Sequence, residues 1–199
     1  QYEDCYDFME GLAAAKKNGK WGFIDTIGNL VIDFTYDDIV YYGFSDGFAG
    51  VKKDGKFGLI DKNGNVVIPF VYDGISDFNR CYVNVVRDGK HGVVNNLGKE
   101  IVPCIYDDVK LNKDGFALVC KNDKWGYVDL NGNDRIPCVY DCYYFCCSED
   151  IWYVSRNGKF GYIDKRCKEV IPCIYDRIIE FGQNYYSSVM RNGKYGIIN

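Results

Sequence analysis

Short apolar stretches alternate with clusters of Gly, Asn and Asp along the chain, a pattern that indicates β-strands joined by tight turns. The pattern recurs as an aromatic-Gly pair, once replaced by His-Gly, at spacings of 36, 34, 34, 35 and 35 residues. The pairs begin at residues 21, 57, 91, 125, 160 and 195. Self-similarity at this period predicts tandem copies of one supersecondary unit that must stack to bury its apolar face.

Each copy predicts antiparallel strands with defined turns. Six residues before the aromatic position stands Ala or Val, as expected for the inward face of a first strand. An Asn-Gly, Asp-Gly or Asn-Asp pair follows, which suits a two-residue type I′ turn. After the second strand, four of five copies place Gly three residues beyond an Asp or Asn, as in a type I turn. A third strand ends near a proline, which we expect at a sheet edge or strand end because proline donates no hydrogen bond.

A second motif, Ile-Pro-x-x-Tyr-Asp with variants, follows the first five aromatic positions. Its Tyr lies 15 residues after the aromatic position in every case: Tyr36, Tyr72, Tyr106, Tyr140 and Tyr175. The distance from that Tyr to the next aromatic position varies from 19 to 21 residues. The first stretch is therefore rigid framework, and the second contains a loop that tolerates insertion.

The combination of Gly-Lys-aromatic-Gly, Ile-Asp-x-x-Gly and Ile-Pro-x-x-Tyr-Asp resembles the WG repeat family, also written KWG. The resemblance runs from about Tyr2 to Asn199, with Trp itself retained at Trp21 and Trp125. It implies a building block of bacterial multidomain proteins whose role is interaction more than catalysis. It carries no catalytic residue.

We expect an all-β chain that forms a single domain of six tandem repeats, near residues 2–35, 36–71, 72–105, 106–139, 140–174 and 175–199. The repeats would stack as a twisted solenoid or bent barrel, and the alternative is a six-bladed β-propeller. Propeller blades usually hold four strands, for which a repeat of about 35 residues is short. The open stack is therefore preferred.

Charge and hydropathy exclude several classes of partner. A net charge of -4 and a pI near 5.1 give no overall positive field for nucleic acid or an anionic membrane, so no specific nucleic-acid partner is expected. No apolar run approaches the roughly 18 residues of a membrane helix, so no membrane insertion is expected. Because the first residue is Gln, we expect a processed product or a piece of a longer protein.

The ten cysteines are placed as packing residues rather than as a disulfide framework. Cys104, Cys138 and Cys173 follow a proline at a repeat position where other copies carry Phe34 and Phe70. A position that accepts Phe or Cys is an apolar packing site, because free Cys behaves as a small hydrophobe. We therefore expect reduced thiols and favour a reducing, cytoplasmic environment.

Recognisable catalytic and metal-binding signatures are missing from the sequence. The set Cys138, Cys142, Cys146 and Cys147 contains no C-x-x-C pair of the kind that zinc sites use. His91 is the only histidine and replaces the signature aromatic residue, so we interpret it as a core substitution. No Ser-His-Asp arrangement or phosphate-binding loop is recognised. We expect no enzymatic activity, no metal and no cofactor.

Two sets of residues are candidates for binding. The first is aromatic and lies in the variable segments: Tyr41, Tyr42, Tyr143, Tyr144, Phe145, Trp152, Tyr185 and Tyr186. Aromatic residues are enriched at protein interfaces, so an unknown protein is the expected partner. The second set is the lysine directly before each aromatic position: Lys20, Lys56, Lys90, Lys124, Lys159 and Lys194.

The lysines have two interpretations. They form a basic ladder that binds a polyanion, or they are solvated or pair with the recurring aspartates Asp37, Asp73, Asp107, Asp141 and Asp176. The sequence predicts a non-catalytic module for protein recognition or scaffolding within a larger protein. The alternative is a carbohydrate- or anion-binding module that uses the tyrosine-rich segments or the basic hairpin edge.

Overall fold

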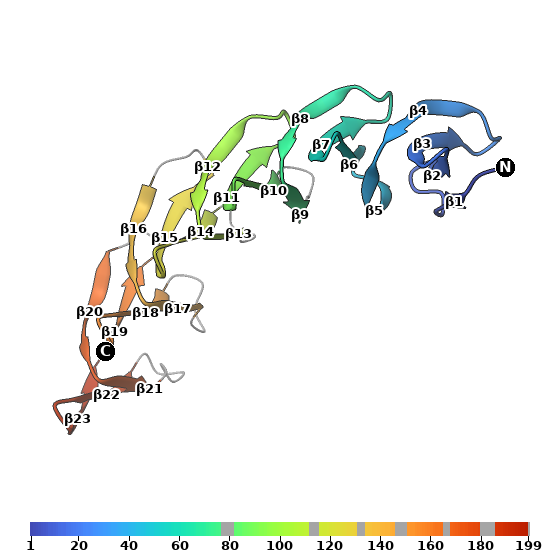
Figure 1. The fold of residues 1–199 in the computed structure, drawn as a ribbon. Coiled ribbons are helices and arrows are strands. Elements are labelled where there is room, and N and C mark those ends of the chain that lie inside the picture. Colours follow the sequence, from blue (N-terminus) through green and yellow to red (C-terminus); the bar gives the residue numbers. More distant parts are fainter. Residues whose placement is uncertain are drawn as a thin grey trace. The chain divides into compact units, whose positions relative to one another are not determined.

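The computed structural model describes residues 1–76, 82–111, 116–130, 134–145, 151–164, 168–179 and 186–198. Within these residues the strands form six antiparallel sheets, one after another along the chain (Figure 1). The expectation of an all-β fold of tandem repeats is therefore confirmed. Among these residues there is no helix long and apolar enough to cross a membrane.

The chain divides into two compact units, residues 1–106 and residues 107–199. In the first unit each sheet is a four-stranded meander in which strands adjacent in sequence pair with each other. The first sheet contains β1 (Asp4–Cys5), β2 (Leu12–Lys17), β3 (Lys20–Asp25) and β4 (Leu30–Tyr36). The second contains β5 (Asp38–Ser45), β6 (Phe48–Lys53), β7 (Lys56–Asp61) and β8 (Val66–Tyr72). The third contains β9 (Gly74–Ser76), β10 (Tyr82–Arg87), β11 (Lys90–Asn95) and β12 (Glu100–Tyr106).

The second unit repeats this arrangement. The fourth sheet contains β13 (Asp108–Leu111), β14 (Phe116–Lys121), β15 (Lys124–Asp129) and β16 (Asp134–Tyr140). The fifth contains β17 (Cys142–Phe145), β18 (Ile151–Arg156), β19 (Lys159–Asp164) and β20 (Glu169–Tyr175). The sixth sheet has three described strands, β21 (Arg177–Ile179), β22 (Ser187–Arg191) and β23 (Lys194–Ile198).

Each sheet begins with a strand that the sequence pattern did not predict. The residues after each Tyr-Asp pair, assigned from sequence to the variable loop, form the first strand of the next sheet, as β5 does by pairing with β6. A single residue, Asp37, separates β4 from β5. Because the junction needs no longer loop, four strands fit into a repeat of this length. The second sheet thus runs from Asp38 to Tyr72, beside the predicted repeat limits of 36–71.

The predicted type I′ turns are confirmed by the backbone angles. In the first sheet Asn18 and Gly19 have φ values of 50° and 75°. The paired residues at 54–55, 88–89, 122–123, 157–158 and 192–193 also have positive φ at both positions. These turns place two basic residues opposite each other across every hairpin, as Lys17 and Lys20 are.

The glycine of the aromatic-Gly pair lies beside a β-bulge of the last strand. Trp21 pairs with Tyr36 but Phe23 pairs with Ile32, so extra residues of β4 bulge next to Gly22. A Cβ atom on Gly22 would lie 2.6 Å from the Ile32 carbonyl oxygen. The backbone of β4 therefore approaches Gly22 too closely for a side chain at this position. The prolines lie on the same bulged edge strands: Pro69, Pro103, Pro137 and Pro172.

Within each unit, neighbouring sheets pack through alternating apolar side chains. Phe23 of the first sheet meets Phe44 of the second edge to face, with ring centroids 4.8 Å apart. In the second unit Tyr127 stacks on Trp152 of the next sheet at 4.5 Å. Full burial of one such side chain stabilises the fold by about 1.5–3 kcal/mol. These inter-sheet layers form the core.

The sixth sheet leaves the corresponding positions uncovered within the described residues. Tyr195 and Ile197 are 72% and 74% exposed, whereas Trp21 and Phe23 at the same repeat positions are 5% and 0% exposed. The same side-chain positions therefore occur both with and without a packed neighbour, which provides matched controls for substitutions.

Candidate partner-binding site

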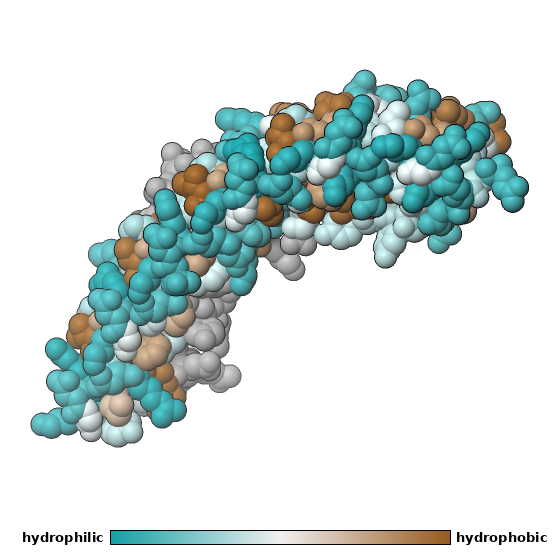
Figure 2. All heavy atoms as spheres, viewed as in Figure 1, coloured by the Kyte–Doolittle hydropathy of each residue, from teal (hydrophilic) through white to brown (hydrophobic). Residues whose placement is uncertain are grey.

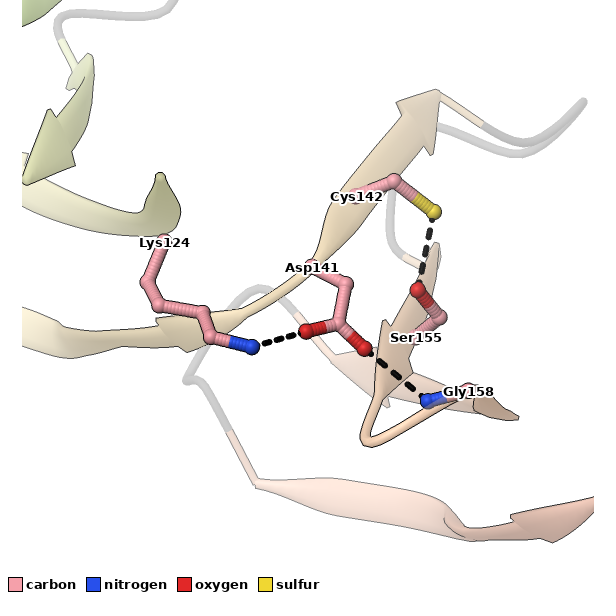
Figure 3. A network of polar contacts seen from close by, with 5 residues as sticks. All are labelled: Lys124, Asp141, Cys142, Ser155 and Gly158. Atoms are coloured by element: carbon pink, nitrogen blue, oxygen red, sulfur yellow. Dashed lines mark hydrogen bonds and ion pairs between the residues drawn. The ribbon is translucent and has the colours of Figure 1, made fainter. Parts of the chain in front are cut away.

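Lysines of the predicted row are held by aspartates at junctions between sheets. Lys124 of β15 forms an ion pair with Asp141, the residue between β16 and β17 (Figure 3). The other carboxylate oxygen of Asp141 accepts a hydrogen bond from the Gly158 N–H in the following sheet, at 3.0 Å. We call this arrangement the junction clamp. It is formed by Lys20–Asp37, Lys56–Asp73, Lys124–Asp141 and Lys159–Asp176.

The clamps reduce the positive charge that the lysine row offers to a ligand. Two hydrogen bonds lower the pKa of Asp37 and of Asp73 below the usual value of an aspartate. The bond from the lysine has the larger effect, and the bond from the turn N–H has the smaller one. The hydrogen bond to Asp37 likewise raises the pKa of Lys20. The geometry of these four pairs matches the ion-pair interpretation rather than a polyanion ladder. Lys90 and Lys194 occupy the same place in the third and sixth sheets, opposite Arg87 and Arg191.

We expect the clamps to make the fold sensitive to acid. The folded-state pKa of the clamp aspartates lies below the value of about 3.9 of an unfolded aspartate. Their contribution to stability is thus fully present above that value and is lost as the pH falls through the folded-state pKa. The urea concentration at half-unfolding, followed by tryptophan fluorescence, should therefore fall between about pH 5 and pH 2.

A variant with all four clamp aspartates replaced by Asn provides the control. Asn keeps an acceptor for the turn N–H but removes the charge. This variant should unfold at lower urea concentration at neutral pH and should show a weaker acid dependence. An acid profile identical to that of the original chain would show that the clamps do not cause it.

The aromatic candidates occupy different environments. Trp152 is buried and stacks on Tyr127, so its ring serves the core instead of a contact surface. Tyr186 is exposed just before β22. The side chains of the other candidates in the second unit lie outside the described residues: Tyr143, Tyr144, Phe145 and Tyr185.

Tyr41 and Tyr42 lie in an irregular part of β5. The pairing jumps from Val40 opposite Gly50 to Ser45 opposite Phe48, so residues 41–44 leave the regular ladder. Both tyrosines have left-handed backbone, with φ of 56° and 68°. This conformation costs an L-residue roughly 1–2 kcal/mol. Their side chains are 48% and 64% exposed.

Tyr6, which belongs to no sequence motif and was missed for that reason, packs against this segment. Its ring stacks on Trp21 at 5.0 Å with an interplanar angle of 6°. It meets the ring of Tyr42 edge to face, at 4.9 Å and 75°. We call Tyr6, Tyr41 and Tyr42 the aromatic corner. Together they bring the segment before β2 next to the irregular part of β5.

Two aspartates lie close to the aromatic corner. Burial raises the pKa of Tyr6, and the negative charges of Asp4 and Asp38 act in the same direction. The carboxylate of Asp4 accepts a hydrogen bond from the Cys5 N–H at 2.8 Å, and that of Asp38 accepts one from the Ile39 N–H at 2.9 Å. In the part of the chain that the structure describes, neither carboxylate has an ion-pair partner.

The described cysteines are free thiols: Cys5, Cys104, Cys120, Cys138, Cys142 and Cys173. Burial raises the pKa of Cys104 and Cys120, and it raises the pKa of Cys173 to about 11. These three thiols are therefore protonated at neutral pH. The Cys142 sulfur lies 3.0 Å from the Ser155 hydroxyl oxygen (Figure 3).

The other candidates for chemistry have structural surroundings. Of the four cysteines considered for a metal site, Cys146 and Cys147 lie outside the described residues. Across the described ranges, no three His, Cys, Asp or Glu residues are grouped as metal ligands. His91 is partly buried and pairs with Tyr106 between β11 and β12.

A family model described as the WG containing repeat matches six successive segments: residues 1–21, 21–57, 57–90, 92–125, 125–159 and 160–195. The chain belongs to the WG repeat family. The resemblance seen in the motifs is thereby confirmed, and the chain is a β-rich module of WG repeats. No curated protein matched the sequence.

Several solved structures are similar to this WG repeat chain. Hsv2p from Kluyveromyces lactis is 10% identical with a TM-score of 0.42, and the match covers 82% of this chain and 61% of that one. A eukaryotic initiation factor is 13% identical with a TM-score of 0.40, covering 93% and 69%. The dihydro-heme d1 dehydrogenase NirN is 12% identical with a TM-score of 0.40, covering 90% and 48%. Likenesses of this degree carry no functional information.

The WG signature residues have structural roles in this chain. The aromatic ring packs, as Trp21 does against Tyr6, and the glycine admits the bulge of the last strand. The lysine joins one sheet to the next through the junction clamp. Outside the signature, the variable segment of the second repeat, which carries Tyr41 and Tyr42, is described in full.

Proposed function

We propose that this WG repeat chain is a non-catalytic module that recognises a protein partner and acts as a scaffold within a larger protein. The observation that supports this function is the contrast between signature and variable positions. The lysines of the junction clamps are engaged internally, as Lys20 is by Asp37. The variable segment of the second repeat instead presents two exposed tyrosines, Tyr41 and Tyr42.

The backbone of these tyrosines adds weight to the proposal. Costly conformations persist where the surrounding structure fixes them, and they are common at functional sites. Exposed tyrosine rings supply large contact areas with few rotatable bonds, which makes them frequent energetic centres of protein interfaces. Figure 2 shows apolar residues dispersed among hydrophilic ones on the visible face.

A carbohydrate-binding module is the second candidate. The Tyr42 ring is 64% exposed, and an open aromatic ring can pack against a sugar as well as against a protein. Anion binding has less support, because the clamped lysines already have carboxylate partners.

The first test is capture of partners from a lysate of the source organism on the immobilised chain. The test variant is Tyr41→Asn with Tyr42→Asn, because Asn tolerates left-handed backbone while removing both rings. The control is Ile27→Asn with Leu97→Asn, which removes two side chains that are each 82% exposed on other turns. We expect a protein that the original chain and the control retain and that the tyrosine variant loses.

A glycan array run in parallel separates the two candidates. Binding of an oligosaccharide that is lost in the tyrosine variant, without any specific protein, would replace protein recognition by carbohydrate binding. If the tyrosine variant retained the same protein, the contact site would not include Tyr41 and Tyr42.

A further inference from the structure

We propose that the aromatic corner, together with Asp4 and Asp38, is a binding site for a cationic side chain of an arginine- or lysine-bearing peptide segment. This inference rests on the proposed protein-recognition function and names the chemistry of the partner. It combines three features of the first two repeats: open aromatic rings, carboxylates without ion-pair partners, and lysines directed elsewhere.

The rings of Tyr6 and Tyr42 have different orientations in the aromatic corner. Tyr6 is fixed from behind by its stack on the buried Trp21, and Tyr42 stands at 75° to it. Gly43 holds this segment close to the chain before β2, since a Cβ on Gly43 would lie 3.3 Å from the Met9 sulfur. The corner is therefore built from two segments that support each other. A cation over the face of a tyrosine ring is attracted by the negative potential of the ring.

The charges beside the corner select the sign of the ligand. Asp37, one residue before Asp38, is neutralised by Lys20 in a junction clamp. Asp38 and Asp4 occupy the same place in their repeats, two residues after Tyr36 and Tyr2, yet neither forms an ion pair among the described residues. Asp4 lies two residues before Tyr6 and Asp38 lies four residues before Tyr42, and the charges of both aspartates act to raise the pKa of Tyr6. A cation at this position would gain from both carboxylates.

The nearest lysines do not satisfy these aspartates. Lys16 is opposite Asp4 in the β1–β2 pairing, and its ammonium lies over the Trp21 ring at 5.7 Å. Lys52 is opposite Asp38, and its ammonium lies over the Phe57 ring at 5.0 Å. The chain thus already places cations on aromatic rings along this edge. An arginine or lysine from a partner would make the same kind of contact with the exposed ring of Tyr42.

The test measures fluorescence anisotropy of a fluorescein-labelled peptide of alternating Arg and Gly, titrated with the intact chain at low salt. We expect saturable binding that weakens as the salt concentration rises. Tyr42→Asn should raise the Kd by about threefold to tenfold, as expected for loss of a cation–π contact and its neighbours. Asp4→Asn with Asp38→Asn should have an effect of similar size. A peptide of alternating Glu and Gly should not bind.

A charge-matched variant separates a site from diffuse attraction to an acidic protein. Asp54→Asn with Asp88→Asn removes the same charge at turn positions where sister repeats carry Asn18 and Asn122. This variant should bind the peptide like the original chain. Equal weakening by both double variants, or no binding of the basic peptide, would overturn the proposed cation site.

The outcomes also distinguish the ligand from the function. If the basic peptide does not bind, but the tyrosine variant loses the protein captured from the lysate, the proposed protein recognition is supported. The proposed cationic character of the bound segment is then wrong. If an uncharged oligosaccharide displaces the peptide from the corner, or binds there without salt dependence, the cation site is replaced by a sugar site.

Discussion

Gly58→Ala and Gly126→Ala are each expected to lower the free energy of unfolding by about 3 kcal/mol, or to prevent folding. The added Cβ would lie 2.6 Å from the Ile68 carbonyl oxygen in the first case and 2.5 Å from that of Ile136 in the second. Both oxygens belong to the backbone of a bulged edge strand, so no side chain can rotate to relieve the overlap. Urea unfolding followed by circular dichroism measures the loss.

Gly196→Ala is the matched control for this prediction. Gly196 has the same place in its repeat, but the nearest atom to an added Cβ is a Val189 methyl carbon at 3.8 Å. The free energy of unfolding should change by no more than about 0.5 kcal/mol. If Gly196→Ala were as destabilising as Gly58→Ala, the cause would lie in the conformational preference of the strand instead of the bulge.

Leu59→Ala is expected to lower the free energy of unfolding by about 2–5 kcal/mol, the range for removing a fully buried leucine side chain. Leu59 is 1% exposed and packs in the cluster that includes Ile68 and Val83, between the second and third sheets. The substitution removes the free energy gained by transferring the leucine side chain out of water on folding, and it leaves a cavity in the folded state. The same urea experiment measures the effect.

Ile197→Ala removes a side chain of similar size at the equivalent repeat position. Because Ile197 is 74% exposed, its loss should change stability by no more than about 0.5 kcal/mol. Comparable losses for the two variants would mean that Ile197 is covered in solution, for example by association of the sixth sheet with another molecule.

The framework could be predicted from sequence because its determinants are local. A type I′ turn needs two residues that accept positive φ, and Asn18-Gly19 supplies them within the motif itself. Gly22 likewise indicates a close backbone approach, because glycine has no side chain. Pro69 indicates an edge strand, because proline donates no hydrogen bond to a neighbouring strand. Each inference requires only the residue type and its position in the repeat.

The additional strand and the aromatic corner escaped prediction for a different reason. Strand β5 pairs irregularly and carries Tyr41 and Tyr42 in left-handed backbone, so it has no clean alternation to detect. Tyr6 and Tyr42 are distant in sequence and meet only through the packing of two sheets. Trp152 shows the opposite case, since an aromatic residue in a variable segment turned out to be core. Sequence position does not specify such non-local contacts.

The junction clamp has a consequence for how arrays of this kind change length. Each clamp takes its lysine from one repeat and its aspartate and turn from the next, so both halves recur once per period. Removal of residues 37–72 by unequal recombination would join Tyr36 directly to Asp73 and leave Lys20 facing an equivalent aspartate. Gain or loss of a whole repeat therefore preserves every ion pair at the new joint, whereas a partial repeat leaves one charge unmatched. Copy number can vary in whole periods at little electrostatic cost.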